Sequence, residues 1–444
     1  MQRSERNELL SKGNPNILRV IPSWKEYFFQ HADTLASDCV VTAQGGTIDS
    51  VRNHLNKLTP IPHSVDIPTT RGQKASDIAR SFTTQSVSAE TLGALYPWTL
   101  IQVAQIPWIE SKVRSASRIS SFDSAQERNR HFVASIVYDN NALEIINNIL
   151  RSQGTDTLVD KATLEAIILS QKLVSSGKKI VIAGAAESGY EENSDAISNI
   201  TSGIYVMLEK LLPGGVYTIS STITNEGEII TQVLPGLGSA KLRADGKIYA
   251  PNSGPILTIQ NGIVFIHPLY TAMKNRFSYF SLLPNFSDIY LQNSTTINRL
   301  QEALDTVASE TVVNDPSILD RHYEDGKRAF VIKAKGAGNA DDEWKTKIAD
   351  IIARKDTTVI VITNADSGDV NLEKYAAGLY SPGVLSGRTL REEAARVLAG
   401  IIQDLSIHDQ LSIHPQKLIE LFCYISGMIE LPYTDTTQAN FVLE

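Results

Sequence analysis

The sequence predicts an α/β protein: a larger N-terminal domain with a mostly parallel sheet flanked by helices, and a smaller C-terminal α/β domain with a parallel sheet. Short apolar runs typical of buried strands, such as Cys39–Thr42 and Thr358–Thr363, alternate with helix-like segments. Alternating strands and helices imply a parallel sheet with right-handed crossovers. The chain has 444 residues, which is enough for two domains with a core each.

The composition narrows the class of protein. The chain is 42% hydrophobic and 20% charged, and its 41 Lys and Arg against 49 Asp and Glu give a net charge of −8. A mildly acidic chain without a basic cluster argues against nucleic acid or an anionic membrane as the main partner. The first residues are too polar for a signal peptide and no apolar run reaches transmembrane length, so the expected location is the cytoplasm. Cys39 and Cys423 are expected to be buried free thiols.

The first part of the chain is predicted to begin with an extension, residues 1–36. Its aromatic cluster around Trp24 and Tyr27 either docks onto the body or contacts a partner. Residues 49–95 are expected to form an extended loop and a short hairpin, which is either a lid or a surface insertion without functional consequence. The other predicted elements are a strand at 39–42, helices at 131–150, 164–175 and 195–210, a compact strand within 178–185, and a hairpin at 216–230.

The two predicted domains are residues 37–270 and 285–444, because the periodicity is lost between 266 and 288. From about residue 408 a C-terminal extension adds a final amphipathic helix and a tail. The second domain is expected to contain strands at 289–291, 329–333 and 358–363, and helices at 296–308, 343–354 and 390–405.

Two polar turns indicate a catalytic site. Gln44-Gly-Gly-Thr-Ile48 places the hydroxyl of Thr47 after a strand and two glycines, which allow close approach of the backbone. Gly154-Thr-Asp-Thr157 lies between two apolar runs, where Thr155 and Asp156 could also serve only as helix caps. Two hydroxyl-bearing turns that each follow an apolar segment suit a site at the carboxyl ends of parallel strands.

Further motifs follow in chain order. They are Phe122-Asp-Ser-Ala125, Lys178 before the strand that ends Ala183-Gly-Ala185, Ser194-Asp-Ala-Ile-Ser-Asn199, Tyr249-Ala-Pro-Asn-Ser-Gly-Pro255, Lys335-Gly-Ala-Gly-Asn339, Ser367-Gly-Asp-Val370, Tyr375 and Gly383-Val-Leu-Ser-Gly387. Together with the two threonine turns, this series resembles the asparaginase/glutaminase family. That family comprises bacterial-type two-threonine L-asparaginases and the related amidotransferase subunit that deamidates glutamine. The resemblance extends from Val40 to about Leu405.

The resemblance implies an amidohydrolase whose nucleophile is Thr47. Amide hydrolysis needs a nucleophile, a base that deprotonates it and donors for the developing oxyanion. By the same resemblance Thr155 and Lys178 form a second hydroxyl–lysine unit, which would activate threonine or water. A lysine serves as a base only if burial or neighbouring charge lowers its pKa.

The substrate implied by the resemblance is L-asparagine or a related small-molecule amide. Asp156 would hold the α-ammonium and Ser124 the α-carboxylate, while Asp123 and Gly46 complete the predicted substrate-binding set. Phe82 falls in the candidate lid. The resemblance also implies no metal or organic cofactor, and a homodimer or homotetramer.

Four positions depart from the family pattern. Phe82 stands where the family has a tyrosine, Gln153 replaces a histidine, and Gln44 replaces a small residue. Asp341 aligns with the family's second asparagine, which contacts the substrate of the neighbouring subunit. These changes keep two other hypotheses open: hydrolysis of a different, larger amide, and amino-acid binding without catalysis on the same scaffold.

Overall fold

The structure is a computed structural model, and it describes residues 16–21, 24, 27, 30–31, 39–42, 50–52, 58–60, 131–134, 179–183, 195–236, 238–241, 247–290, 294–354 and 356–429. These residues fall into two compact units. The first runs to Ala272 and the second begins at Met273, except that Ala250–Ser253 belongs to the second. Helix α10 (Pro268–Ser278) spans the division.

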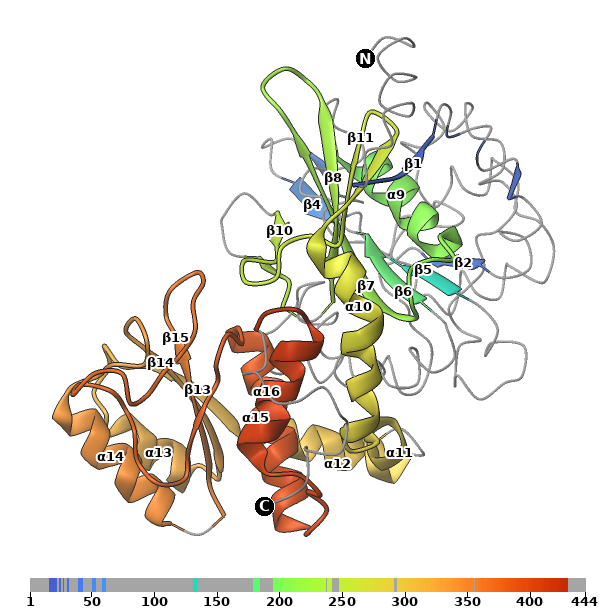
Figure 1. The fold of residues 1–444 in the computed structure, drawn as a ribbon. Helices are drawn as coiled ribbons and strands as arrows, with labels where there is room; N and C mark the ends of the chain where they lie inside the picture. The colour runs from blue at the N-terminus through green and yellow to red at the C-terminus, as the bar shows by residue number, and fades with distance from the viewer. Residues whose placement is uncertain are drawn as a thin grey trace. The chain divides into compact units, whose positions relative to one another are not determined.

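An eight-stranded sheet in the order β1-β12-β11-β8-β7-β6-β5-β2 forms the first unit (Figure 1). The neighbours β2, β5, β6 and β7 are parallel, and the pairs from β7 through β8, β11 and β12 to β1 are antiparallel. The α/β class is confirmed, with a sheet that is parallel only on its β2 side. The strands are β1 (Ile17–Val20), β2 (Cys39–Thr42), β5 (His131–Ala134), β6 (Lys179–Ala183), β7 (Gly215–Ile223), β8 (Ile229–Pro235), β11 (Leu257–Gln260) and β12 (Ile263–Ile266).

Helix α9 (Ala196–Leu208) packs against β5, β6, β7 and β8, where a helix was predicted. Residues 201–208 are all buried, which is the pattern of a helix covered on every side. The predicted hairpin is confirmed as β7 and β8, and Gly227 supplies the positive φ of 78° in its turn.

Lys179 is the first residue of β6 and anchors the start of this strand to α9. This side chain is only 2% exposed, and its Nζ donates to the carbonyl oxygens of Val206, Met207 and Glu209 at the end of α9. A cation at a helix C-terminus satisfies free carbonyls and complements the helix dipole.

The aromatic residues of the N-terminal extension dock onto α9. The rings of Trp24 and Tyr27 lie 5.9 Å and 5.6 Å from the ring of Tyr205, and burial raises the pKa of Tyr27 to about 12. Arg19 of β1 lies 3.4 Å from the buried carboxylate of Glu209. Within the extension β1 is thus an edge strand of the sheet, and the docking alternative is confirmed for Trp24 and Tyr27.

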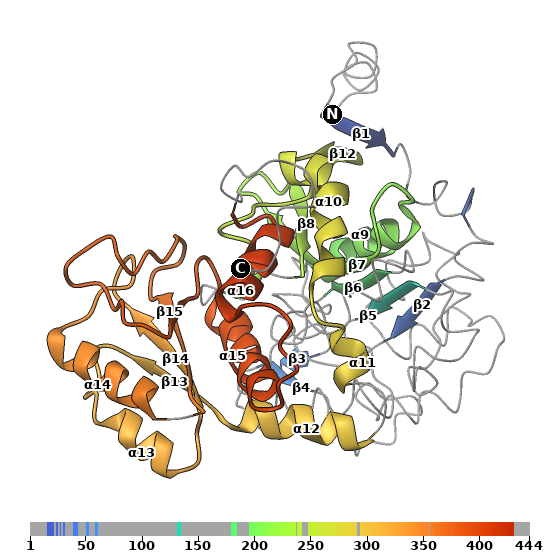
Figure 2. The same ribbon diagram turned by 60° about the horizontal axis from the view of Figure 1, so that its bottom comes forward.

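The second unit is a doubly covered parallel sheet of β13 (Val307–Thr311), β14 (Ala329–Ala334), β15 (Thr358–Thr363) and β16 (Val384–Ser386). In Figure 2, α13 (Ile318–Glu324) and α14 (Asp342–Ala353) lie on one side of the sheet and α15 (Glu392–Ile407) lies on the other. Phe330, Ile332 and Val361 share a buried cluster with Trp344 of α14. Because helices cover both faces of the sheet, the sequences of β14 and β15 are nearly continuous apolar runs.

The C-terminal helices extend this unit. Helix α16 (Pro415–Ile425) confirms the predicted final amphipathic helix. Buried Arg276 of α10 donates to the carbonyl oxygens of Tyr424 at 2.7 Å and Ile429 at 3.0 Å, and lies 4.5 Å from the Tyr424 ring centre. The remaining elements are the 3₁₀ turn Tyr279–Leu282, α11 (Phe286–Tyr290), α12 (Ser294–Asp305), and the strand pairs β3 (Ser50–Arg52) with β4 (Leu58–Pro60) and β9 (Ala240–Lys241) with β10 (Ile248–Tyr249).

Two predictions of secondary structure were wrong, and one helix was predicted with the wrong end. Residues 289–291 were predicted as a strand, but α11 includes Tyr290, whose buried hydroxyl donates to Asp404 at 2.6 Å. The predicted helix 296–308 ends at Asp305, and the strand β13 follows it at once. The predicted helix 131–150 begins instead as strand β5, which pairs with β2 and β6. Short apolar runs do not distinguish strand from helix, and here the neighbouring strands decide.

Candidate functional site

The predicted catalytic and substrate-binding residues lie outside the described part of the chain. They are Gly46, Thr47, Asp123, Ser124, Thr155, Asp156 and Lys178, and the candidate lid residue Phe82 lies outside it as well. Their roles therefore stay predictions, as do those of Gln44 and Gln153. The structure does describe strands next to two of these residues: β2 ends before Thr47, and β6 begins after Lys178.

The strand directions bear on whether Thr47 and Lys178, which are predicted to act in one site, can lie close together. Thr47 follows the carboxyl end of β2 by five residues, and Lys178 directly precedes the amino end of β6. Since β2, β5 and β6 run parallel, these two ends point to opposite edges of the sheet. A contact between the two side chains requires a segment that crosses back over a strand length of about 15 Å.

The motif Lys335-Gly-Ala-Gly-Asn339 forms a closed turn after β14. Lys335 N donates to Asn339 O at 3.0 Å, and Asn339 N donates to Lys335 O at 2.8 Å. Gly338 has a φ of 106°, and a Cβ there would lie 2.9 Å from Leu372 Cδ2. The turn thus packs tightly against the loop that follows β15, at the carboxyl edge of this sheet, where open α/β sheets bind ligands.

Asp341, one of the departures from the family pattern, begins α14. Its Oδ1 accepts a hydrogen bond from Trp344 N at 3.0 Å, and its φ and ψ of −76° and 172° are those of an N-cap residue. This cap gives a structural reason for a short acidic side chain at the position.

Asn252 joins two distant segments of the second unit. Its Nδ2 donates to Thr389 O at 3.0 Å, and its Oδ1 accepts from Gly368 N at 3.1 Å. Three of the predicted motifs therefore meet through one side chain: the segment around Asn252, the turn around Gly368, and the strand end that precedes Thr389.

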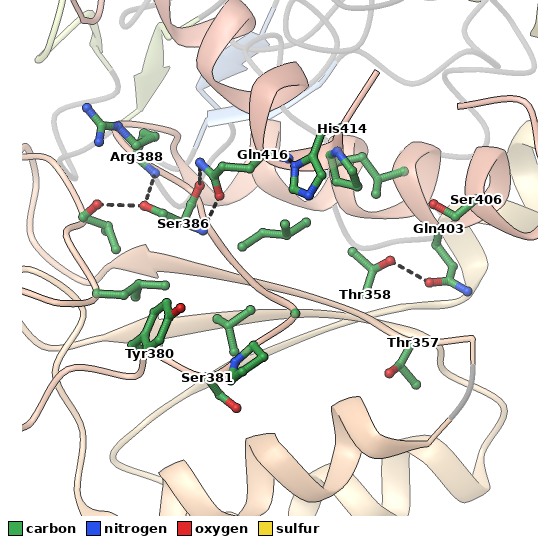
Figure 3. A pocket seen from close by; sticks show the side chains of 18 of the residues that line it. Thr357, Thr358, Tyr380, Ser381, Ser386, Arg388, Gln403, Ser406, His414 and Gln416 are labelled. Atoms are coloured by element: carbon green, nitrogen blue, oxygen red, sulfur yellow. Dashed lines mark hydrogen bonds between the residues drawn. The ribbon is translucent and has the colours of Figure 1, made fainter. Parts of the chain in front are cut away.

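A cavity of about 820 Å³ opens beside β16, the edge strand of the second sheet (Figure 3). Its walls come from the start of β15, the loops before β16, the end of α15 and the first turn of α16. Apolar side chains include Leu372, Val384, Leu385, Ile402 and Pro415.

Two glutamines connect the segments that form the walls of this cavity through side-chain hydrogen bonds. Gln416 accepts from Ser386 N at 2.8 Å and donates to Ser386 O at 3.1 Å, so its amide pairs with the edge strand as another strand would. Gln403 accepts from Thr358 Oγ1 at 2.7 Å and donates to Asp356 O at 2.6 Å. Sequence reasoning missed the cavity, because each glutamine bonds to residues at least 30 positions away.

Neither a membrane-spanning helix nor a metal-binding cluster is found in the part of the chain that the structure describes. Among those residues no helix combines the length and the apolar character needed to cross a bilayer. Within the same ranges no three or more His, Cys, Asp or Glu side chains gather into a group that could hold a metal ion.

The comparison with protein families gives a match within the second unit. Residues 311–404 match the family model of the Glutaminase/Asparaginase C-terminal domain. This range contains β14, α14, β15 and β16, most of α15, and the turns around Asn339 and Gly368. The resemblance to the asparaginase/glutaminase family is thereby confirmed, and it rests on the match of this part of the chain to the C-terminal domain of that family.

The chain is also similar to individual proteins, which include an amidotransferase subunit and two L-asparaginases. The chain is 25% identical over 245 residues to a subunit of the Glutamyl-tRNA(Gln) amidotransferase of Methanococcus vannielii, and the match covers 53% of this chain and 51% of that protein. The chain thus spans about half the length of this curated relative. A probable cytoplasmic L-asparaginase from Campylobacter jejuni aligns with a TM-score of 0.49 and 16% identity, over 87% of this chain and 99% of its own. The thermostable L-asparaginase from Thermococcus kodakarensis aligns with a TM-score of 0.49 and 14% identity, over 89% and 100%.

Proposed function

We propose that this protein is an amidohydrolase that converts the side-chain amide of L-asparagine, or of a related free amino acid, to the acid and ammonia. The observation that carries the proposal is the match of residues 311–404 to the Glutaminase/Asparaginase C-terminal domain. The two threonine motifs around Thr47 and Thr155 support it, because they supply the hydroxyls that such a reaction needs.

In the proposed mechanism the Thr47 hydroxyl attacks the amide carbonyl, the C–N bond breaks, and the nitrogen leaves as ammonia after it takes up a proton. Water then cleaves the acyl–threonine ester, which releases the acid and restores Thr47. Thr155 and Lys178 assist the proton transfers, and Asp156 and Ser124 hold the charged ends of the substrate. These steps use side chains and water alone. We also propose that the enzyme is a cytoplasmic homodimer or homotetramer.

L-glutamine is the second candidate substrate. The curated relative belongs to an amidotransferase, and the chain matches it over 245 residues. A larger amide and a binding role without catalysis are the remaining alternatives. The departures from the family pattern and the insertion within residues 49–95 favour the larger amide, and Phe82 and Asp341 favour the binding role.

The test is ammonia release by the purified protein from L-asparagine, L-glutamine, D-asparagine, β-aspartyl peptides and small amides. Thr47→Ala is the blank, and Lys178→Met tests the predicted lysine. Lys210→Met is the matched control, since Lys210 is an exposed lysine of the same unit. We expect release from L-asparagine that Thr47→Ala and Lys178→Met abolish and Lys210→Met leaves unchanged.

Each possible result of the assay tests a different part of the proposal. No release from any amide by folded protein would refute the amidohydrolase. Release that persists in Thr47→Ala would refute the nucleophile. Release that persists only in Lys178→Met would leave the reaction in place and remove Lys178 from it, which is the arm that the strand directions make most informative.

A further inference from the structure

The cavity beside β16 has the size and lining of a small-molecule site, and no residue of the proposed hydrolysis belongs to it. Its volume of about 820 Å³ lies within the range of about 300–1,000 Å³ for ligand pockets. Leu385 and Ile402 in its wall are 8% and 1% exposed, so they belong to the core and do not rearrange freely. The apolar wall calls for a ligand with an apolar body.

The frame of the cavity excludes an extended peptide as occupant. A peptide that adds to a sheet edge needs free backbone groups on the edge strand. The N–H and C=O of Ser386 are both taken by the side chain of Gln416. Val384 N is taken by Ser381 O at 3.0 Å. The edge is therefore closed to strand addition, and a compact molecule fits better.

The charges of the lining favour a cation. Three carboxylates belong to it, those of Asp356, Glu373 and Glu420, and one guanidinium, that of Arg388. Arg388 is already paired with Asp369 at 2.9 Å. The local excess of negative charge attracts an ammonium group and repels a carboxylate.

An aromatic ring is available to the same cation. Tyr380 lines the cavity and is 58% exposed, and Figure 3 shows its ring beside the apolar side chains of the wall. Cations bind over aromatic faces, most strongly where water is partly excluded. We propose that this cavity binds a small organic amine with an apolar body, whose ammonium group is attracted by the ring of Tyr380 and by the carboxylates of the lining.

The test is calorimetric titration of the full chain with three probes of one shape: phenethylamine, N-acetylphenethylamine and 3-phenylpropionate. The amine should bind, and the neutral and anionic probes should bind at least tenfold more weakly. Tyr380→Ala should weaken binding of the amine about two- to fivefold, which is the scale of a cation–π contact at an exposed ring. Tyr375→Ala is the matched control, because Tyr375 is 51% exposed in the same loop and lies outside the lining.

A second pair of variants tests the charges. Glu373→Gln with Glu420→Gln should weaken the amine and not the neutral probe. Equal binding of all three probes, no binding of the amine at millimolar concentration, or equal losses in Tyr380→Ala and Tyr375→Ala would each overturn the proposal. Circular dichroism of each variant separates loss of binding from loss of folding. Thr47→Ala should bind the amine as the natural chain does, so this result and that of the ammonia assay stand apart.

Discussion

Asp341→Ala should remove the hydrogen bond that begins α14, whereas Asp341→Asn should keep it. The bond runs from Trp344 N to Asp341 Oδ1 at 3.0 Å. Loss of such a cap costs about 1 kcal/mol, since an amide N–H is left without its partner. Loss of the negative charge at the helix N-terminus adds about 0.5 kcal/mol. We therefore expect the free energy of unfolding to fall by about 1.5 kcal/mol in Asp341→Ala and by about 0.5 kcal/mol in Asp341→Asn.

Urea and thermal denaturation at pH 7 measure both values. For a unit of this size, 1 kcal/mol shifts Tm by about 2–4 °C, so Asp341→Ala should melt about 3–6 °C lower. Ser317→Ala is the control, because Ser317 occupies the N-cap of α13 without a side-chain cap bond, and it should change stability by less than about 0.5 kcal/mol. Equal destabilisation in Asp341→Ala and Asp341→Asn would refute the reasoning, because the charge and not the bond would then stabilise the helix.

Gly378→Ala should destabilise the second unit by about 3 kcal/mol in urea denaturation, because its Cβ would overlap the carbonyl oxygen of Leu372, which cannot rotate away. Cys423 should react with iodoacetamide at pH 8 at least a hundredfold more slowly than a free thiol, because burial raises its pKa to about 11. For Glu392, burial alone would raise the pKa, but the bonds from Lys333 and Ser309 lower it overall. Its contribution to stability is therefore present above the unfolded pKa of about 4.3 and lost as the pH falls through the lower folded pKa, so Glu392→Gln should be less stable than the natural chain at pH 7 and approach it below about pH 4.

Each of these has its own control. Gly326→Ala places a Cβ at a positive φ of 87° but within 4 Å of no atom, so it lacks the overlap expected in Gly378→Ala and should cost only about 1 kcal/mol. A Cys39→Ser background isolates Cys423, and rapid labelling there would mean that α16 opens. A constant difference between Glu392→Gln and the natural chain from pH 7 to pH 3 would show that the carboxylate gains nothing from Lys333 in the folded state.

The elements of the second unit could largely be predicted from the sequence, because local pattern and tertiary environment agree there. The run Thr358–Thr363 is apolar and buried on both faces, and the segment of α15 repeats its apolar residues at helical spacing. The segment Lys335–Asn339 stood out in the sequence as a motif, and its two glycines are residues that favour turns. In these segments a few neighbours along the chain determine the conformation.

The features that could not be predicted depend on contacts between residues that are distant in the sequence. The sequence around Tyr290 is typical of a strand. The environment of this residue is set by Asp404, more than 100 residues away, and by Arg299, 9 residues away. The cavity beside β16 likewise depends on Gln416 reaching Ser386 across a turn of the chain. No local pattern carries these contacts, because the partners become neighbours only when the sheet has formed.

Strand direction adds a condition that motif order cannot supply. The family resemblance assigns Thr47 and Lys178 to one site from the order of the motifs. The parallel arrangement of β2 and β6 distinguishes a residue that follows a strand from one that precedes it. Catalytic groups of open α/β sheets gather after the carboxyl ends. If Lys178→Met retains activity while Thr47→Ala does not, the base should therefore be sought among the residues that follow the carboxyl ends of the parallel strands, and the assignment of Thr47 would be strengthened by the same result.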